Sequence, residues 1–140
     1  MHLIDSNIWI AAKIEKDYWH KKGKEIVKKI LDGALKKVVI TDYIVDEVVT
    51  YLNARTNFET AREMLETLTS SQFIEVIIID AQQFEKTKEI FEKNKNLSFT
   101  DASSVVVMQD KKINKIISFD EDFDGIEGIE RVKSILYLKP

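Results

Sequence analysis

The sequence predicts an α/β fold: a three-layer α/β/α sandwich around a central, mainly parallel sheet of about five strands. Short runs of aliphatic and β-branched residues alternate along the chain with longer amphipathic stretches, as strands alternate with helices. The 140 residues include only four Gly and one Pro and show no internal repeat, so we expect a single domain over residues 1–140. Strands joined by helices pair in parallel and place helices on both faces of the sheet.

Five apolar segments predict the strands. In chain order they are residues 2–4, 38–40, 73–79, 115–119 and 131–136. The third is rich in β-branched side chains, which suit a pleated and buried surface. Its run Ile77-Ile78-Ile79 is expected to lie in the core, together with Val105-Val106-Val107 of a later helix.

Amphipathic periodicity and capping signals predict the helices. They are a turn from residue 7 and longer helices over residues 17–35, 58–70, 80–95 and 100–112. A further helix begins at Thr41 or Asp42, since either side chain can cap it. Its apolar residues recur at helical spacing: Ile44, Val45, Val48, Val49 and Leu52. Asp80 and Gln83 have the spacing of a capping box at the start of their helix.

Composition excludes several classes of protein. The net charge of −3 excludes a polycation that coats nucleic acid, and the absence of cysteine excludes disulfides and thiolate zinc sites. No run approaches about 18 apolar residues, and the first residues lack a signal-peptide pattern, so we expect a cytoplasmic protein with no membrane segment. Four lysine clusters are interpreted as solvated helix faces: Lys21-Lys22-Lys24, Lys28-Lys29, Lys36-Lys37 and Lys111-Lys112-Lys115.

Four acidic residues far apart in the chain are the candidate functional site: Asp5, Glu47, Asp101 and Asp120. Asp5 and Asp120 directly follow the first and fourth predicted strands, and ligands of parallel sheets bind at the carboxyl ends of strands. Carboxylates gathered at one edge repel each other unless a cation lies among them. Oxygen ligands of this kind suit a hard divalent ion, Mg²⁺ or Mn²⁺, and therefore phosphate chemistry.

Glu47 has an acidic neighbour, and helix geometry distinguishes the two. Residues four positions before and after Glu47 are Tyr43 and Tyr51, which border the apolar stripe, so Glu47 is expected to be semi-enclosed. Asp46 is expected to be solvated. Considered alone, Glu47 also fits an ordinary surface position.

The other three acids have structural explanations that stay open at this point. Asp5 can simply cap the helix that follows it. Asp101 completes a capping box with Ser98, although its spacing to Val105 and Met108 places it on the side of the helix that faces the core. Asp120 opens an acidic loop that can be a solvated turn, in which Asp122 and Asp124 are candidate auxiliary ligands.

The residues around these acids resemble the motifs of PIN-domain ribonucleases over essentially the whole chain. The four motifs are Asp5-Ser6-Asn7-Ile8-Trp9-Ile10, Val45-Asp46-Glu47-Val48, Thr100-Asp101-Ala102 and Ser118-Phe119-Asp120-Glu121-Asp122-Phe123. Their order, their intervals and the chain length agree with that family. Each motif is common by itself, whereas the ordered set is specific.

The resemblance implies a metal-dependent endoribonuclease that cleaves RNA with one or two Mg²⁺ or Mn²⁺ ions held by the four acids. Asn7, Thr100 and Ser118 would orient these ligands or a metal-bound water. The sequence is most similar to the toxin component of VapBC-type toxin–antitoxin pairs, which implies a homodimer and an inhibitory antitoxin protein as partner.

Two other functions remain open from the sequence. A PIN-type RNA-processing or RNA-binding protein without a toxin role would carry the same motifs. A Mg²⁺-dependent phosphotransfer enzyme or receiver domain also places acids at the strand edge of an α/β sheet. Haloacid-dehalogenase-type phosphatases need Asp-x-Asp, where this chain has Asn7, and receivers need a phosphoacceptor after the third strand, where Asp80 stands.

Overall fold

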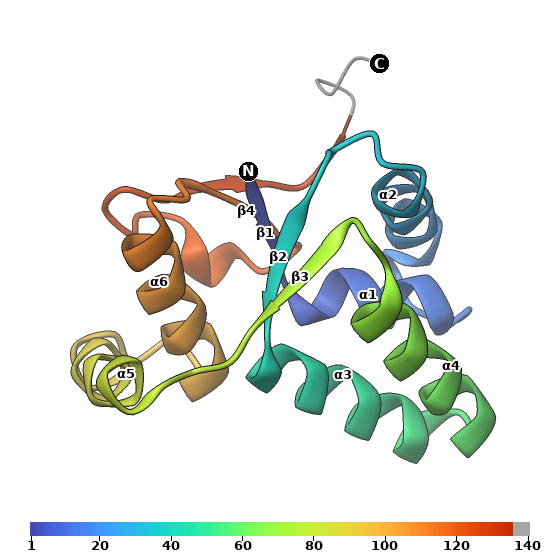
Figure 1. Cartoon of the computed structure of the whole chain (residues 1–140), viewed down its shortest axis with the longest axis horizontal. Helices are drawn as coiled ribbons and strands as arrows, with labels where there is room; N and C mark the ends of the chain where they lie inside the picture. The colour runs from blue at the N-terminus through green and yellow to red at the C-terminus, as the bar shows by residue number, and fades with distance from the viewer. Residues whose placement is uncertain (136–140) are drawn as a thin grey trace.

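Five parallel strands form the central sheet of the computed structural model, which describes residues 1–135. The strands are β1 (His2–Ile4), β2 (Val38–Thr41), β3 (Ile74–Ile77), β4 (Lys115–Ile117) and β5 (Glu130–Val132). Their order across the sheet is β3-β2-β1-β4-β5, and each neighbouring pair is parallel (Figure 1). The predicted α/β class and parallel sheet are confirmed.

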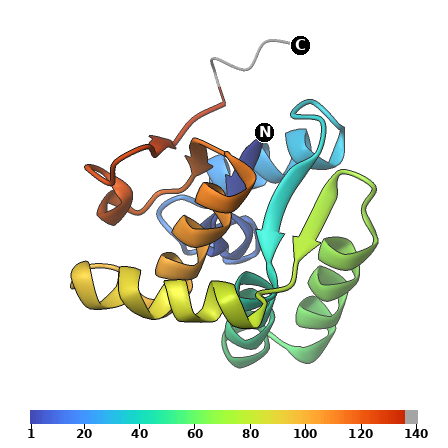
Figure 2. The same cartoon turned by 60° about the vertical axis from the view of Figure 1, so that its left-hand side comes forward.

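Helices cover both faces of this sheet and complete three layers. They are α1 (Ser6–Lys13), α2 (His20–Leu31), α3 (Asp42–Arg55), α4 (Phe58–Ser70), α5 (Ala81–Lys93) and α6 (Phe99–Lys111), with a short 3-10 helix η1 (Glu121–Phe123). The chain moves from β1 to β2 to β3 through α1 to α4, which lie on one face. It then returns to β4 through α5 and α6 on the other face (Figures 1 and 2). This is the arrangement that right-handed crossovers produce.

The boundaries of several elements differ from those expected. Helix α1 is longer than the predicted turn, and α2 begins at His20 and ends at Leu31 rather than covering residues 17–35. The early end of α2 follows from Gly33, whose φ of 82° belongs to the left-handed region that terminates helices. Strand β5 begins at Glu130, and the predicted extension to Leu136 lies outside the described residues.

The core lies where the inner strands meet the helices. Val105, Val106 and Val107 of α6 are buried, as predicted. Of the run Ile77-Ile78-Ile79, the two outer residues pack partly buried against the core, whereas the expectation for Ile78 is wrong because it is 67% exposed. Strand β3 is at the edge of the sheet and the chain leaves it after Ile77, so the end of this run loses its cover. The inner strands β1, β2 and β4 are almost wholly buried, and this burial holds the residues at their carboxyl ends in place.

The carboxyl ends of β1, β2 and β3 face the lower side of the molecule in Figure 1, where α1, α3 and α6 begin. The chain leaves β1 toward one edge of the sheet and β4 toward the other, so a topological switch point lies between these two neighbours. Among residues 1–135, no helix has the length and apolar character needed to cross a membrane.

Candidate active site: a carboxylate cluster at the strand ends

Asp5 is the buried centre of the site. It is the N-cap of α1 at the end of β1, and its residue is only 2% exposed. Its Oδ1 accepts a hydrogen bond from the Ser6 backbone N–H at 2.8 Å, and its Oδ2 accepts one from Ser118 Oγ at 2.6 Å. The pKa of Asp5 is raised to about 7, mainly by burial and also by the nearby carboxylates of Asp101 and Glu47, against the lowering effect of the two hydrogen bonds.

Ser118 joins the ends of β1 and β4. Besides donating to Asp5, its Oγ accepts hydrogen bonds from Asn7 Nδ2 at 3.2 Å and from the Asp120 backbone N–H at 3.0 Å. Asn7 Oδ1 in turn accepts from the Phe119 backbone N–H at 3.2 Å. Asn7 therefore acts on Asp5 through Ser118 rather than by direct contact, and one hydroxyl sets the positions of two of the four acids.

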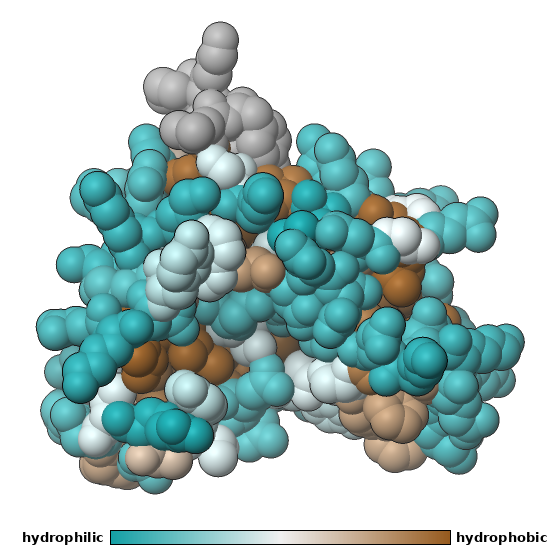
Figure 3. All heavy atoms as spheres, turned by 180° about the vertical axis from the view of Figure 1, so that it is seen from behind, coloured by the Kyte–Doolittle hydropathy of each residue, from teal (hydrophilic) through white to brown (hydrophobic). Residues whose placement is uncertain are grey.

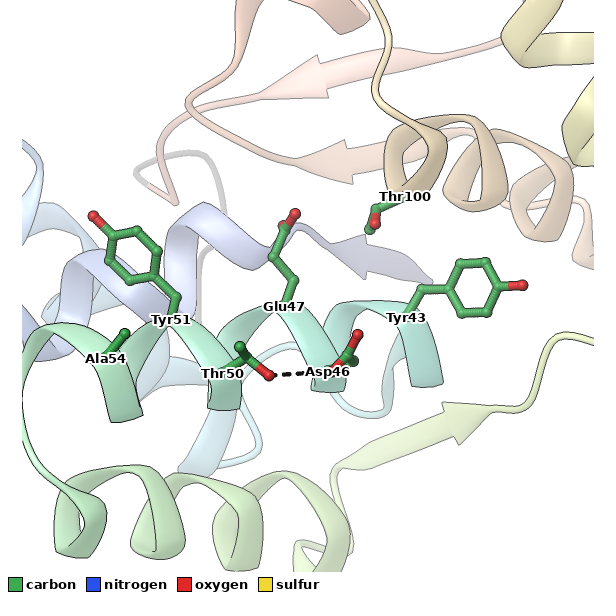
Figure 4. Close-up of a pocket in the computed structure, with 7 residues that line it drawn as sticks. All are labelled: Tyr43, Asp46, Glu47, Thr50, Tyr51, Ala54 and Thr100. Carbon is green, nitrogen blue, oxygen red and sulfur yellow. Dashed lines mark hydrogen bonds between the residues drawn. The ribbon is translucent and has the colours of Figure 1, made fainter.

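Glu47 extends from α3 toward the start of α6 (Figure 4). The Ser6 hydroxyl donates to its carboxylate, and the side chain lines a cleft of about 560 Å³ together with Thr100. Glu47 is exposed rather than semi-enclosed, because α3 borders this open cleft. Asp46 is solvated as predicted, and it accepts a hydrogen bond from Thr50 Oγ1 at 3.1 Å.

Asp101 is both a helix cap and a neighbour of the other acids. It forms the predicted capping box of α6: the Ser98 backbone N–H donates to Asp101 Oδ2 at 3.1 Å, and the Asp101 backbone N–H donates to Ser98 Oγ at 3.0 Å. The residue is half-buried. Burial raises the pKa of Asp101 to about 6, and the carboxylates of Asp120 and Glu47 contribute to that rise. The capping explanation of Asp101 is therefore correct, and the cap leaves its carboxyl near those of Asp120 and Glu47.

Asp120 begins the acidic loop. It is the N-cap of η1, and its Oδ1 accepts from the Asp122 backbone N–H at 2.9 Å. Asp120 raises the pKa of the exposed Asp122, which lies beside it. Asp124 is held differently: Arg131 Nε and Nη2 donate to its two oxygens at 2.8 and 3.0 Å, and these bonds lower the pKa of its carboxyl. Of the two auxiliary candidates, Asp122 is the one without a cationic partner among residues 1–135.

The chemistry of the donors suits a hard cation, although the acids stand apart. Among residues 1–135, no three His, Cys, Asp or Glu side chains lie close enough to hold a metal ion directly. The repulsion among the acids nevertheless shows that they share one neighbourhood. Mg²⁺ usually keeps several waters and is bound through one or two carboxylates plus substrate phosphates. Asp5 and Asp101, the two carboxyls whose pKa is raised mainly by burial, fit such a site.

Two residues in the site did not stand out in the sequence. Ser6 binds Glu47, and Arg131 fixes the acidic loop while donating to the Ser118 carbonyl at 3.2 Å. The position of Ser6 next to Asp5 in the first turn of a helix was a signal for it. Nothing in the sequence pointed to Arg131, because its role depends on the pairing of β5 with β4.

A family comparison decides the identity of this fold. Residues 2–129 match the model of the PIN domain. The chain belongs to the PIN-domain family. The strand order also excludes the receiver-domain alternative: β3 of this PIN domain lies at the sheet edge, so Asp80 follows a strand remote from β1 and caps α5.

Known proteins similar to this PIN domain are VapC-type proteins. A VapC ribonuclease of Archaeoglobus fulgidus is 32% identical over 124 residues, which are 86% of this chain and 78% of that protein. Among solved structures, Mycobacterium tuberculosis VapC20, a Sarcin-Ricin loop cleaving toxin, has a TM-score of 0.78 at 24% identity, covering 92% of this chain and 98% of that one. VapBC2 from Rickettsia felis, bound to a DNA fragment from its promoter, has a TM-score of 0.67 at 12% identity, covering 94% and 96%.

Proposed function

We propose that this PIN domain is a metal-dependent endoribonuclease that cleaves RNA phosphodiester bonds with one or two Mg²⁺ or Mn²⁺ ions. The observation that carries the proposal is the burial of Asp5 beside Asp101 and Glu47 at the strand ends. A buried carboxylate with carboxylate neighbours destabilises the protein unless a cation compensates it. The similarity to a protein named VapC ribonuclease supports RNA cleavage as the reaction in which that cation takes part.

Each acid has a part in the proposed site. Asp5, Glu47, Asp101 and Asp120 would hold the metal, with Asp122 as an auxiliary ligand. A bound divalent ion supplies a more acidic water and stabilises charge that develops on the phosphate. Ser118 and Asn7 orient Asp5 and the start of the acidic loop, and Ser6 orients Glu47. Thr100 lines the cleft beside Glu47, where it can orient a water or the substrate.

We further propose that the protein is the toxin of a toxin–antitoxin pair, acting in the cytoplasm as a homodimer and held inactive by an antitoxin protein. The support is that similar folds occur in a toxin–antitoxin complex from Klebsiella pneumoniae and in VapBC2 from Rickettsia felis. Co-expression with the product of a short adjacent gene should restore the growth of cells that the protein arrests. Unimpaired growth during expression of the active protein would instead favour an RNA-processing role.

Cleavage of labelled RNA tests the nuclease directly. The wild type should cleave in Mn²⁺ or Mg²⁺ and not in EDTA, and Asp5→Asn or Asp101→Asn should abolish cleavage while the fold persists. Glu63→Gln is the matched control, because it removes an exposed carboxylate from α4, outside the cleft that Glu47 lines. Full activity of Asp5→Asn or Asp101→Asn would refute the assignment of the site.

A further inference from the structure

The cleft beside Glu47 extends the carboxylate cluster along α3. Seven residues line it: Tyr43, Asp46, Glu47, Thr50, Tyr51, Ala54 and Thr100. Figure 4 shows Glu47 pointing into it between two tyrosine rings that point in opposite directions along the helix, with Thr100 across the gap. From behind, hydrophilic side chains cover most of the molecule, and hydrophobic ones show between them in several separate groups (Figure 3).

The spacing of the two tyrosines restricts what can bind both. Tyr43 and Tyr51 are eight residues apart in α3, which places them about 12 Å apart along the helix axis. Successive bases stacked in a nucleic-acid helix are only about 3.4 Å apart along each strand. Bases resting on the two rings therefore cannot be stacked neighbours of a duplex, whereas an unpaired strand can spread its bases over that distance.

Tyr51 is available to a base and has a cation beside it. The residue is 39% exposed, and the Arg55 guanidinium lies 5.3 Å from the centroid of its ring. The other two arginines are engaged by carboxylates, Arg62 by Glu59 and Arg131 by Asp124. Arg55 forms no salt bridge with any carboxylate within residues 1–135, so its charge is free for a phosphate.

The Tyr43 ring is fixed by packing against another aromatic ring. Its ring stacks on Phe99 at 6.1 Å between centroids, and Phe99 packs against Phe84 and Phe91 of α5 at 5.5 and 5.8 Å. A ring already fixed by packing loses little conformational freedom when a ligand stacks on it. The rings of Tyr43 and Tyr51 therefore lie slightly more than one helical turn before and after Glu47.

We infer that Tyr51 and Arg55 form a nucleotide subsite of the proposed ribonuclease, with the base stacked on the Tyr51 ring and an adjoining phosphate paired with the Arg55 guanidinium. Tyr43 receives a second base on the other side of Glu47. The scissile phosphate then lies between the two bases and faces the acids. The inference rests on the proposed function, and it assigns the bound ligand as an unpaired stretch of RNA.

Steady-state kinetics of RNA cleavage test the subsite. Base–aromatic stacking corresponds to a change of roughly 5- to 160-fold in affinity, so Tyr51→Ala should raise KM by that factor and leave kcat within about twofold. Tyr51→Phe keeps the ring and should behave as the wild type. Arg55→Ala should raise KM and reduce the slope of log KM against log salt concentration by about 0.7, the value for one phosphate on a single strand. Phe58→Ala, a 68% exposed aromatic on α4 outside the cleft, is the control and should change neither constant.

Direct binding separates failure of the subsite from failure of the proposed function. Fluorescence anisotropy with a labelled unpaired RNA, and with its duplex, is measured on the Asp101→Asn protein with and without Tyr51→Ala. Weaker binding of the unpaired RNA alone on removal of the ring supports the subsite, even if no cleavage is found in the wild type. Equal KM and equal affinity for Tyr51→Ala, Arg55→Ala and the parent proteins would overturn it while leaving metal-dependent cleavage intact.

Discussion

Asp5 should make the protein less stable as the pH rises, and replacing it with Asn should remove that effect. In the folded protein its pKa is raised from 3.8 to about 7, mainly by burial. Below pH 3.8 the carboxyl is protonated in both the folded and the unfolded state. Between pH 3.8 and 7 only the unfolded state releases the proton, so the free energy of unfolding falls by about 1.4 kcal/mol per pH unit. Above pH 7 the loss reaches about 4 kcal/mol.

Asp5→Asn also has a destabilising effect, because it changes the hydrogen bonds that Asp5 accepts. Ser6 N–H donates to Oδ1 and Ser118 Oγ donates to Oδ2, and even a protonated carboxyl accepts at both oxygens. The amide nitrogen of Asn can only donate, so one of these two donors loses its acceptor. An unsatisfied buried donor costs about 1–3 kcal/mol. We therefore expect the Asn variant to be less stable than the wild type near pH 4 by that amount, and more stable by about 1–3 kcal/mol at pH 8.

Urea unfolding in EDTA measures this change of sign. Trp9 is fully buried, so its fluorescence reports the loss of the core. The free energy of unfolding is compared between wild type and Asp5→Asn from pH 4 to 8, which cancels the titration of groups that both proteins share. Asp46→Asn removes one carboxylate from the exposed surface and should show no such crossing. A difference between wild type and Asp5→Asn that stays constant over this pH range would refute the desolvation of Asp5.

Three other outcomes follow from the same contacts. Ser118→Ala removes the donor to Asp5 and the acceptor for the Asp120 amide, so urea unfolding should show a loss of about 1–3 kcal/mol, larger at pH 8 than at pH 5. Arg131→Lys loses the paired hydrogen bonds to Asp124, so we expect a lower unfolding free energy and slower RNA cleavage, with Asp124→Asn changing both in the same direction. Mn²⁺ at about 100 times its Kd should stabilise the wild type by about 2.7 kcal/mol in thermal melts, and an equal gain for Asp5→Asn would contradict its role as a ligand.

The sequence predicted the layout of the site better than its details. Asp5 could be placed because it directly follows β1, and Asp120 because it comes three residues after the end of β4, and strand ends meet at one edge of a parallel sheet. Glu47 could be preferred to Asp46 from helical spacing, but its exposure could not be predicted. Whether a helix face is covered depends on which element packs opposite it, and here an open cleft lies there.

The resemblance named Asn7 and Ser118 as residues that orient the acids, but the partners of their contacts were beyond the sequence for a different reason. Ser118 and Asn7 are 111 positions apart, and Arg131 reaches Asp124 and the Ser118 carbonyl only because β5 pairs with β4. Local patterns carry no information on such partners. The same limit applies to Arg55, whose importance appears only once the other two arginines are seen to be engaged by carboxylates.

The choice between cap and metal ligand, which the sequence left open, is not a choice between exclusive roles. Asp5, Asp101 and Asp120 all lie in the first turn of a helix or at its N-cap, where backbone N–H groups and the helix dipole favour negative charge. Each carboxylate has more acceptor positions than its capping bonds use. Capping therefore fixes the orientation of the acid while leaving lone pairs for a cation. Because these helices begin where the strands end, the bonds that start them also bring the acids together, and this is why the capping pattern and the proposed metal site share the same residues.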